Sequence, residues 1–563
     1  MKIMTPWRLR GLSVGLFLLG LFTRFALLGY PRQVVFDEYH FGKFVNGYLR
    51  GEFFFDIHPP LGRLLLALSA YLGGYDGSQP WAKIGEEIGS DVPIAWLRAP
   101  SALQGAALLP LLFATGRAAG LSVPAALLAP LCVLFDICFL VESRLVLTDA
   151  TLLLGLCLQL YGSFSSDAFP ALSRGWLKST AIAGIGITLA VCTKWTGTSA
   201  VAVAGLHSLL SLTRTFTGSR VNGRTAAFRA VGGEAVVRVG LLLLLPLLVY
   251  VCCFALHFWL LPKTGRGVSF MTREFRATLE GDEALDPTSP LAADLAALPD
   301  FWGKFYELNA RMLSANAKLK REHSWGSRWY EWPLMMRSVL FWVGKAEPYK
   351  LPATGQTFAR IYCIGSPAVW WLAAAAPTVF VARALSRLMG ILSPLPPDPT
   401  TSDPDASDPG DGSEATGYDP EGGAVARRRF VNGCLLLAGY VINWLPFVMV
   451  DRVAFLYHFL PALLFALLLL GVVFDSVVPS TPLLGDRDLG DDDPSAATTT
   501  TAAAAFLPPL REIQTHPDAL RWLLVGLIVY VLAAIFAFFS PLAYGNPMTF
   551  ENLNARLWLR SWE

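Results

Sequence analysis

The 563-residue chain has few charged residues and lacks the motifs of nucleotide-binding enzymes. Asp, Glu, Lys and Arg make up 16% of it, and the formal net charge of +2 provides no field that would favour a nucleic-acid partner. No Walker loop, GxGxxG fingerprint or HExxH sequence occurs, so a nucleotide-sugar donor is not predicted. Most of the eight cysteines lie in apolar runs, which is typical of small core residues. No metal site is predicted, because the histidines are scattered.

Hydrophobic residues dominate instead. They make up 54% of the sequence, and the mean hydropathy of +0.47 predicts an all-α polytopic membrane protein. A helix that spans a membrane needs about 20 apolar residues. By that measure the sequence predicts about eleven spans, namely Gly11–Gly29, Pro93–Thr115, Ser122–Val141, Leu145–Leu160, Thr180–Val191, Gly197–Leu212, Val239–Leu261, Ser366–Ala382, Phe430–Val450, Val453–Phe474 and Leu520–Phe539.

Basic residues set the predicted orientation of these spans. Three of them lie within positions 2–10, before the first span, and the positive-inside rule therefore places the N-terminus in the cytoplasm. Alternation along the chain then brings the arginines of 214–229, 383–387 and 427–429 to the same side. With an odd number of spans, the C-terminus is predicted to lie on the outer side.

The same alternation divides the chain into regions. Residues 1–384 form a transmembrane region, whose two long loops, 30–92 and 262–365, both lie outside. Within the first loop, Leu61–Leu72 is too short to span and is predicted to be an amphipathic helix in the membrane interface. The remaining segments are predicted as a disordered cytoplasmic linker over 385–428, a pair of spans over 429–474, a second such linker over 475–519, and a last span with an outer tail over 520–563.

Two adjacent acids, Asp37 and Glu38, follow the first span. Their neighbours are aromatic and apolar, which partly desolvates the pair, and adjacent carboxylates repel each other. One of the two is therefore a candidate general base, although they could also be solvated surface acids. The sequence does not decide between them; we favour Asp37.

Further charged and aromatic residues gather on the predicted outer side. Cations at one membrane face are suited to neutralising the phosphate of a lipid-linked donor, whereas the alternative is a set of snorkelling anchors and helix-pairing ion pairs. The candidates for phosphate binding are Arg98, Lys194 and Arg452. Supporting candidates are Arg24, His58, Arg144, Asp149, His323, Arg328, Tyr457 and His458.

These motifs resemble the protein O-mannosyltransferase family of GT-C membrane glycosyltransferases. The resemblance rests on segments in the family's order from the first span to the C-terminus, which are Phe36–Lys43, Phe54–Pro60, Gly74–Gly77, Arg98–Ala102, Ser143–Arg144, Cys192–Trp195, His323–Pro333, Arg452–Pro461 and Ala555–Trp562. Loop 262–365 is too short for the β-trefoil MIR domain of many members, so the chain resembles a member that lacks it.

The resemblance implies a GT-C fold with juxtamembrane helices on the luminal side. It also implies transfer of mannose from dolichyl (polyprenyl) phosphate mannose to Ser or Thr hydroxyls of secretory proteins, with inversion at the anomeric carbon. Asp37 and Glu38 match the family's acidic motif, Arg24 and Arg98 match arginines important for activity, and Lys194 and Arg452 fall where the lipid phosphate is expected. Whether a metal is required stays open.

The implied partners are Ser/Thr-containing acceptor proteins, the membrane lipid donor, and a second transferase in a homo- or heterodimer. The implied location is the endoplasmic reticulum membrane with a luminal C-terminus, or the plasma membrane if the chain is bacterial or archaeal. Two other functions remain as alternatives: a GT-C transferase that acts on a lipid or glycan, and a membrane transporter. The transporter is disfavoured because no internal repeat is found.

Overall fold

The computed structural model describes residues 6–283, 298–318, 323–344, 357–390, 420–478, 480 and 518–563. The helices of the first half are α1 Pro6–Phe25, α2 Glu38–Arg50, α3 Leu61–Leu72, α4 Ile94–Ala118, α5 Val123–Leu134, α6 Ile137–Glu142, α7 Asp149–Ser166, α8 Arg174–Val191, α9 Thr198–Ser219, α10 Arg224–Val239 and α11 Leu245–Leu260. Those of the second half are α12 Arg273–Arg276, α13 Phe301–Lys318, α14 Pro367–Leu388, α15 Pro420–Trp444, α16 Leu460–Val477, α18 Ala519–Phe539, α19 Pro541–Tyr544 and α20 Phe550–Asn554.

The core of the bundle lies around α4, α5, α7 and α16. Helix α4 packs against α1, α5 and α7, and α16 packs against α5, α14 and α15. Nearly every residue of α16 is buried, whereas α11 and α18 expose large apolar side chains such as Leu248 and Leu527. Exposed apolar faces of this kind are expected where helices border lipid rather than water.

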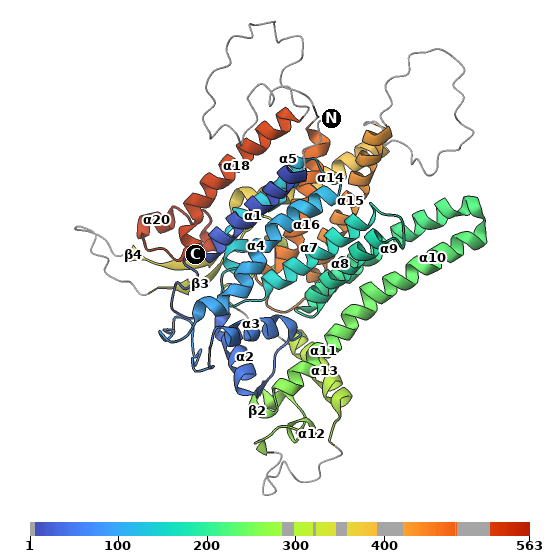
Figure 1. Ribbon diagram of the computed structural model, residues 1–563. Helices are drawn as coiled ribbons and strands as arrows, with labels where there is room; N and C mark the ends of the chain where they lie inside the picture. Colours follow the sequence, from blue (N-terminus) through green and yellow to red (C-terminus); the bar gives the residue numbers. More distant parts are fainter. Residues whose placement is uncertain are drawn as a thin grey trace, which may run out of the picture.

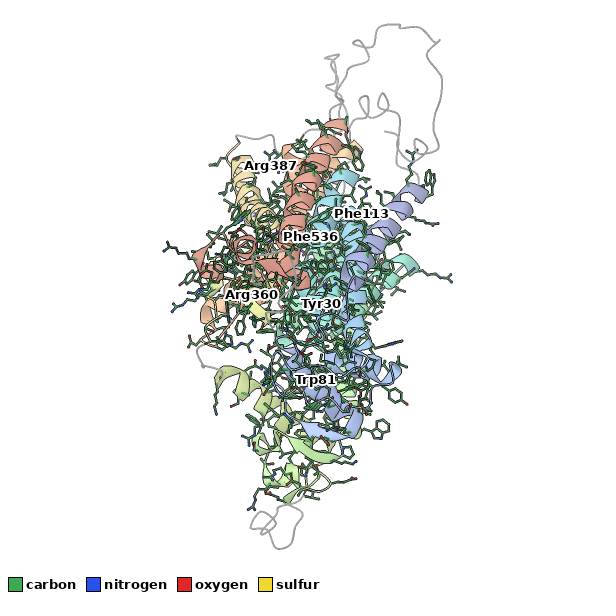
Figure 2. All side chains as sticks on the ribbon, turned by 90° about the vertical axis from the view of Figure 1, so that its left-hand side faces the viewer. Tyr30, Trp81, Phe113, Arg360, Arg387 and Phe536 are labelled. Carbon is green, nitrogen blue, oxygen red and sulfur yellow. The ribbon has the colours of Figure 1, made fainter. Side chains whose placement is uncertain are left out.

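The molecule is elongated, and α2, α3, α12 and α13 form one end, the loop end (Figure 1). The N-terminal helix begins at the opposite end, where α15 and α18 also begin (Figure 1). Figure 2 places Arg387 and Trp81 towards opposite ends, with Tyr30 between them. Arg387 was predicted to be cytoplasmic and Trp81 to lie in an outer loop; the side of the membrane that each end faces stays a prediction.

Six helical segments among the described residues are long and apolar enough to cross a membrane: Ile94–Ala118, Arg224–Leu260, Pro367–Leu388, Gly423–Met449, Leu456–Val477 and Ala519–Phe539. Helices α1, α7, α8 and α9 coincide with further predicted spans but are not among the six. The number of eleven spans therefore stays a prediction.

Two predicted spans have different bounds in the structure. The span predicted over 122–141 is broken between α5 and α6, where Asp136 accepts hydrogen bonds from the backbone N–H groups of Phe139 (2.9 Å) and Ser366 (2.8 Å). This carboxylate caps α6 and ends the continuous helix. The span predicted to begin at Val239 is part of a longer helix from Arg224, with a π-turn over Gly240–Leu244 just before a proline.

The edges of the predicted linkers are helical, which corrects their bounds. Helix α14 extends to Leu388, and α15 already begins at Pro420. Asp475, predicted to start a disordered linker, is buried in the last turn of α16, where it lies 3.4 Å from Arg429 and 3.5 Å from Arg521. Those two cations compensate its charge and fix the helix end. Most of 385–428 and 475–519 lies outside the described residues.

The outer segments add short strands that the all-α prediction did not contain. The described strands are β1 Glu52–Phe54, β2 Lys263–Arg266, β3 Val339–Val343, β4 Thr357–Phe358, β5 Arg360–Cys363 and β6 Met548–Thr549. Parallel β1 and β2 join the two long loops, antiparallel β3 and β5 pair within the second loop, and β4 pairs with β6 of the C-terminal tail. The interfacial segment Leu61–Leu72 is a helix, as predicted.

Candidate active site

Glu38 and Arg98 form a fully buried ion pair. Nε and Nη2 of Arg98 donate to the two carboxylate oxygens of Glu38, each at 2.8 Å, and neither side chain is exposed. The same oxygens accept hydrogen bonds from the backbone N–H groups of Val35 (3.1 Å) and Val146 (3.0 Å). Nη1 of Arg98 donates to the backbone carbonyls of Leu28 and Pro31 in the loop after α1. The pair therefore ties this loop to α2, α4 and the α6–α7 turn. This geometry does not fit the predicted roles of Glu38 as a base and of Arg98 as a phosphate ligand.

Asp37, one residue earlier, has the opposite environment. It precedes α2 but forms no capping hydrogen bond, and no described residue donates a hydrogen bond to its half-buried carboxylate. Burial raises the pKa of this carboxyl to about 7, Lys194 opposes that rise, and Asp149 and Asp56 add to it. A carboxylate with a free acceptor oxygen and a pKa near neutrality has the properties of a general base.

A strained backbone positions Asp37. Phe36 has a φ of +44°, a conformation that is rare for a bulky residue. Its ring stacks on Phe341 with centroids 4.0 Å apart, and its N–H donates to the Phe341 carbonyl at 3.1 Å. The ring of Tyr457 lies edge-on to both phenyl rings. This packing holds the turn in the left-handed region, and such strain occurs preferentially at functional sites.

Lys194 and Asp149 form a second ion pair, and it lies close to Asp37. Lys194 Nζ is 2.8 Å and 2.7 Å from the two oxygens of Asp149, and both side chains retain slight exposure. Glu142, at the end of α6, is near enough to interact electrostatically with Asp37, Asp149 and Lys194. Three carboxylates are therefore within electrostatic range of one lysine, and one of them contacts it.

Arg452 lies in the segment before α16, and both it and Lys194 are within electrostatic range of His58 and His458. Its Nη1 donates to Oδ1 of Asn316 at 2.6 Å, and its Nη2 lies 3.1 Å from Nε2 of His458. Asn316, on α13, also donates to the carbonyl of Ile57 at 2.9 Å. Burial, together with the charges of Lys194 and Arg452 among others, lowers the pKa of His58 well below its usual value. His58 is therefore neutral at neutral pH, near two cations.

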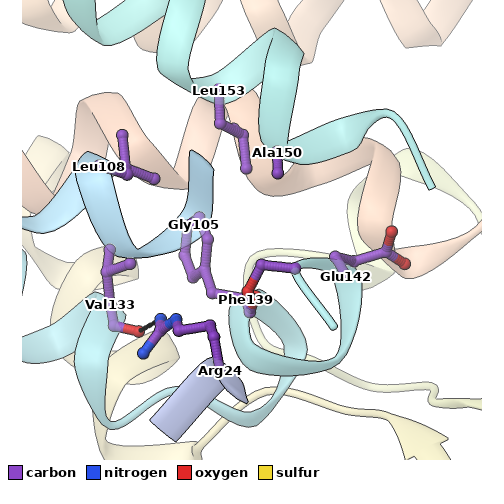
Figure 3. A pocket seen from close by; sticks show the side chains of 9 residues that line it. Arg24, Gly105, Leu108, Val133, Phe139, Glu142, Ala150 and Leu153 are labelled. Atoms are coloured by element: carbon purple, nitrogen blue, oxygen red, sulfur yellow. Dashed lines mark hydrogen bonds between the residues drawn. The ribbon is translucent and has the colours of Figure 1, made fainter. Parts of the chain in front are cut away.

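Arg24 and Arg144 lie away from this group, around the end of α1. Arg24 is fully buried, and its Nη2 donates to the Val133 carbonyl at 3.0 Å. Arg24 and Glu142 line the same small cavity, and the carboxylate of Glu142 points away from Arg24 (Figure 3). Arg144 donates to four backbone carbonyls at the end of α1 and lies over the ring of Tyr544. Both arginines therefore hold the helix end and do not face Asp37.

His323 and Arg328 are exposed. The His323 ring packs edge-on against Phe455, with centroids 5.2 Å apart, so this segment contacts the one that carries Arg452. The Arg328 side chain is not brought to Asp37 by any described contact. Among the described residues, no group of three or more His, Cys, Asp or Glu side chains could hold a metal ion.

Two functional candidates, Asn316 and Asp56, were not selected from the sequence, whereas Glu142 was noted with Arg144 and Asp149 among the charged residues at the span ends. Asn316 falls in a predicted loop without a motif, although the structure places it on α13. Asp56, although part of a matched motif, pairs with buried Arg63, whose Nη2 donates to the His58 carbonyl. The available signal was the run Asp56-Ile57-His58-Pro59-Pro60, which marks a tight polar corner. The partner of that corner on α13 is more than 250 residues away in sequence.

Comparison with known proteins assigns the chain to a family. Residues 14–262 match the model of the dolichyl-phosphate-mannose-protein mannosyltransferase family, and residues 301–401 and 413–562 match that of the C-terminal four-TMM region of protein-O-mannosyltransferase. The chain belongs to this family. The resemblance seen in the motifs is thereby confirmed.

Individual relatives agree with this assignment. The chain is 37% identical over 282 residues to dolichyl-phosphate-mannose–protein mannosyltransferase 4 of Candida albicans. This alignment covers 49% of this chain and 36% of that protein. It is 33% identical over 267 residues to protein O-mannosyl-transferase 1 of Mus musculus, covering 47% and 35%. These alignments span about a third of the length of the curated relatives.

A solved structure shares the fold. A chain of the S. cerevisiae protein O-mannosyltransferase Pmt1-Pmt2 complex bound to the sugar donor superposes with a TM-score of 0.78 at 19% identity. The match covers 100% of this chain and 93% of that one. The predicted polytopic helical GT-C fold is therefore confirmed.

Proposed function

We propose that this mannosyltransferase-family protein transfers mannose from dolichyl (polyprenyl) phosphate mannose to Ser or Thr hydroxyls of proteins, with inversion at the anomeric carbon. The observation that carries the proposal is the environment of Asp37. Its half-buried carboxylate accepts no hydrogen bond from a described residue, and burial raises its pKa to about 7. It lies within electrostatic range of Lys194. A candidate base and a cation are thus close to each other.

In this mechanism Asp37 accepts the proton of the acceptor hydroxyl as its oxygen attacks the anomeric carbon. The bond from that carbon to the phosphate oxygen breaks, and its electron pair leaves with the lipid phosphate. Lys194 and Arg452 stabilise the departing phosphate, which gains negative charge in the transition state. Glu38 and Arg98 act indirectly, because their ion pair fixes the turn that carries Asp37.

Asp149 and Asn316 have a supporting role in this proposal. Asp149 holds Lys194 through both carboxylate oxygens and thereby fixes the position of its ammonium group. Asn316 holds Arg452 in the same way from α13. Preorganised cations need no reorganisation when the phosphate leaves, which is the main advantage of such a site.

We also propose the setting of the reaction. The loop end faces the lumen of the endoplasmic reticulum, the N-terminus is cytoplasmic, and the C-terminal tail is luminal. If the chain is bacterial or archaeal, the equivalent membrane is the plasma membrane. The acceptors are Ser/Thr-containing secretory proteins. A related transferase is the proposed partner, because the Pmt1-Pmt2 chains, one of which shares this fold, form a complex.

The direct test is transfer of labelled mannose by the purified full-length protein in nanodiscs. Polyprenyl phosphate mannose is the donor, and a Ser/Thr-rich peptide is the acceptor. The expected product is an α-mannosyl peptide that is released by β-elimination. A labelled lipid or glycan with an unlabelled peptide would instead identify the alternative, a GT-C transferase with another acceptor.

The activity is expected to fall as the pH is lowered through about 7. Only deprotonated Asp37 can accept a proton, and burial raises its pKa from the ordinary value near 4 to about 7. The base form is therefore lost about three pH units earlier than for an exposed aspartate. The measurement is kcat/KM for the acceptor peptide between pH 5 and 9, which reports the free enzyme. A flat profile down to pH 5 would contradict the assignment.

Replacing Asn316 with Ala is expected to lower kcat/KM for the donor by about tenfold. Hydrogen bonds to charged groups are worth about 1.5–3 kcal/mol, and this change frees Arg452 from its contact with α13. Donor titrations at saturating peptide measure the effect. The matched control is Asn309→Ala on the same helix, because Asn309 contacts Tyr250 and Phe305 but not Arg452. Equal losses in the two variants would show that the effect comes from α13 and not from Arg452.

A further inference from the structure

A polar depression at the loop end is not used by the proposed reaction. It has a volume of about 270 Å³ and lies between α2, strands β1 and β2, and the loop that follows α3. Helix α2 contributes Lys43, Asn46 and Arg50, which occupy one face at helical spacing. Strand β2 contributes Arg266, and Phe53 and Phe54 of β1 also line the depression. Figure 1 shows α2 and β2 together at this end.

The walls of the depression are firmly held. Asn46 is buried; it donates to the Gln79 carbonyl at 2.7 Å and accepts from the hydroxyl of Tyr75 at 2.8 Å. Gly47 brings α2 so close to β1 that a Cβ there would lie 2.6 Å from the Phe54 ring. The basic side chains are therefore presented by a fixed frame.

The charge of the depression is positive. Lys43, Arg50 and Arg266 line it together with a single acid, Glu52. Lys43 Nζ lies 3.2 Å from the centroid of the Tyr39 ring, and Arg50 donates to a backbone carbonyl. Within the part of the chain that the structure describes, none of the three cations forms a salt bridge. They remain available to an anionic ligand.

Helix α2 links the proposed base, which precedes its first residue, to the depression, which is lined by residues further along the helix. Lys43 is six residues from Asp37, or roughly 9 Å along a helix that rises about 1.5 Å per residue, and Arg50 is roughly 20 Å away. An extended peptide rises about 3.3 Å per residue. A peptide whose hydroxyl is at Asp37 would therefore place side chains about three to six residues away over the cations.

We propose that this depression binds acidic side chains of the acceptor polypeptide, about three to six residues from the modified Ser or Thr. The inference rests on the proposed function and adds an acceptor preference to it. Carboxylates suit the site because guanidinium and ammonium groups bind them with charge-assisted hydrogen bonds, while the exposed position of Arg50 and Arg266 lets a polypeptide enter from water.

The test compares matched peptides on the full-length protein in nanodiscs of neutral lipid. One set carries Glu three to six residues before or after a single Thr, a second carries Gln there, and a third carries Lys. We expect kcat/KM for one of the Glu peptides to exceed that of its Gln counterpart by about two- to fivefold, and the difference to shrink in high salt. Arg266→Glu should abolish the preference for Glu, because two cations, Lys43 and Arg50, would then face two acids.

Lys83→Glu is the matched control, since Lys83 is an exposed cation of the same outer loop that does not line the depression. It should leave the peptide order unchanged. Equal rates for Glu, Gln and Lys peptides, or the same change in both variants, would overturn the subsite while leaving the proposed transfer intact. An Arg266→Glu effect that requires anionic lipid and ignores peptide charge would also overturn it. Failure to modify any peptide would instead contradict the proposed function.

Discussion

Replacing Asp37 with Asn is expected to lower mannose transfer by roughly 10²–10⁴-fold, the range typical for loss of a general base. The amide has nearly the same shape but cannot accept the hydroxyl proton. The fold should be preserved, because no described residue donates a hydrogen bond to this side chain and its neighbours keep their contacts. The measurement is the initial rate of peptide mannosylation at saturating donor and pH 8, where wild-type Asp37 is deprotonated.

Asp91→Asn provides the matched control for that variant. Asp91 is an exposed acid of the same outer loop, so its replacement should change the rate by less than twofold. Donor binding by the Asp37 variant should persist, since the proposed phosphate ligands Lys194 and Arg452 are untouched. Wild-type turnover in the Asp37 variant would remove Asp37 from the mechanism.

Replacing Glu38 with Gln is expected to destabilise the protein by about 3–5 kcal/mol, the range measured when one partner of a buried ion pair is removed. Arg98 would keep its charge in a fully buried position without a counter-charge. Arg98→Met should cost a similar amount, because it leaves the Glu38 carboxylate unpaired. Thermal unfolding of the detergent-solubilised protein, followed by tryptophan fluorescence, measures both losses.

The double variant Glu38→Gln with Arg98→Met distinguishes an ion pair from two independent contacts. If the charges compensate each other, its destabilisation should be clearly smaller than the sum of the two single losses. Glu280→Gln serves as the control because Glu280 is exposed, and its unfolding temperature should match the wild type. Additive losses in the double variant would refute the coupling.

Variants of the two adjacent acids are therefore expected to lose activity for different reasons. An Asp37 variant should be folded and inactive, whereas a Glu38 variant should be unstable and inactive only to the extent that it unfolds. Activity per folded molecule separates the two outcomes. This distinction matters because an activity assay alone would assign both residues to catalysis.

Much of the fold follows from the sequence. Runs of about 20 apolar residues predicted the positions of most long helices, since a bilayer fixes the length of a spanning segment. The break at Asp136 was missed because its partner Ser366 is 230 residues away. The buried ion pairs of Asp475 were missed for the same reason, because Arg429 and Arg521 come from other helices.

The site was predicted in part. Asp37, Lys194 and Asp149 come together as the clustering of charges on one membrane face indicated, and Arg452 lies beside His458. Arg24, Arg98 and Arg144 carry the same charge in the same kind of sequence, yet all three bind backbone carbonyls. Sequence gives the charge of an arginine but not the partner that it finds.

By itself, then, the sequence determined that the chain is a polytopic membrane protein and that an acidic pair follows the first helix, while the side on which its loops lie stays a prediction. These features depend on hydropathy and charge, which are properties of local segments. Only the tertiary structure decided that Glu38 forms a buried ion pair with Arg98, whereas no described residue donates a hydrogen bond to the Asp37 carboxylate. The reason is physical: the free energy of a carboxylate depends on the donors and charges packed around it, and for Glu38 the donors Arg98 and Val146 come from segments 60 to more than 100 residues away.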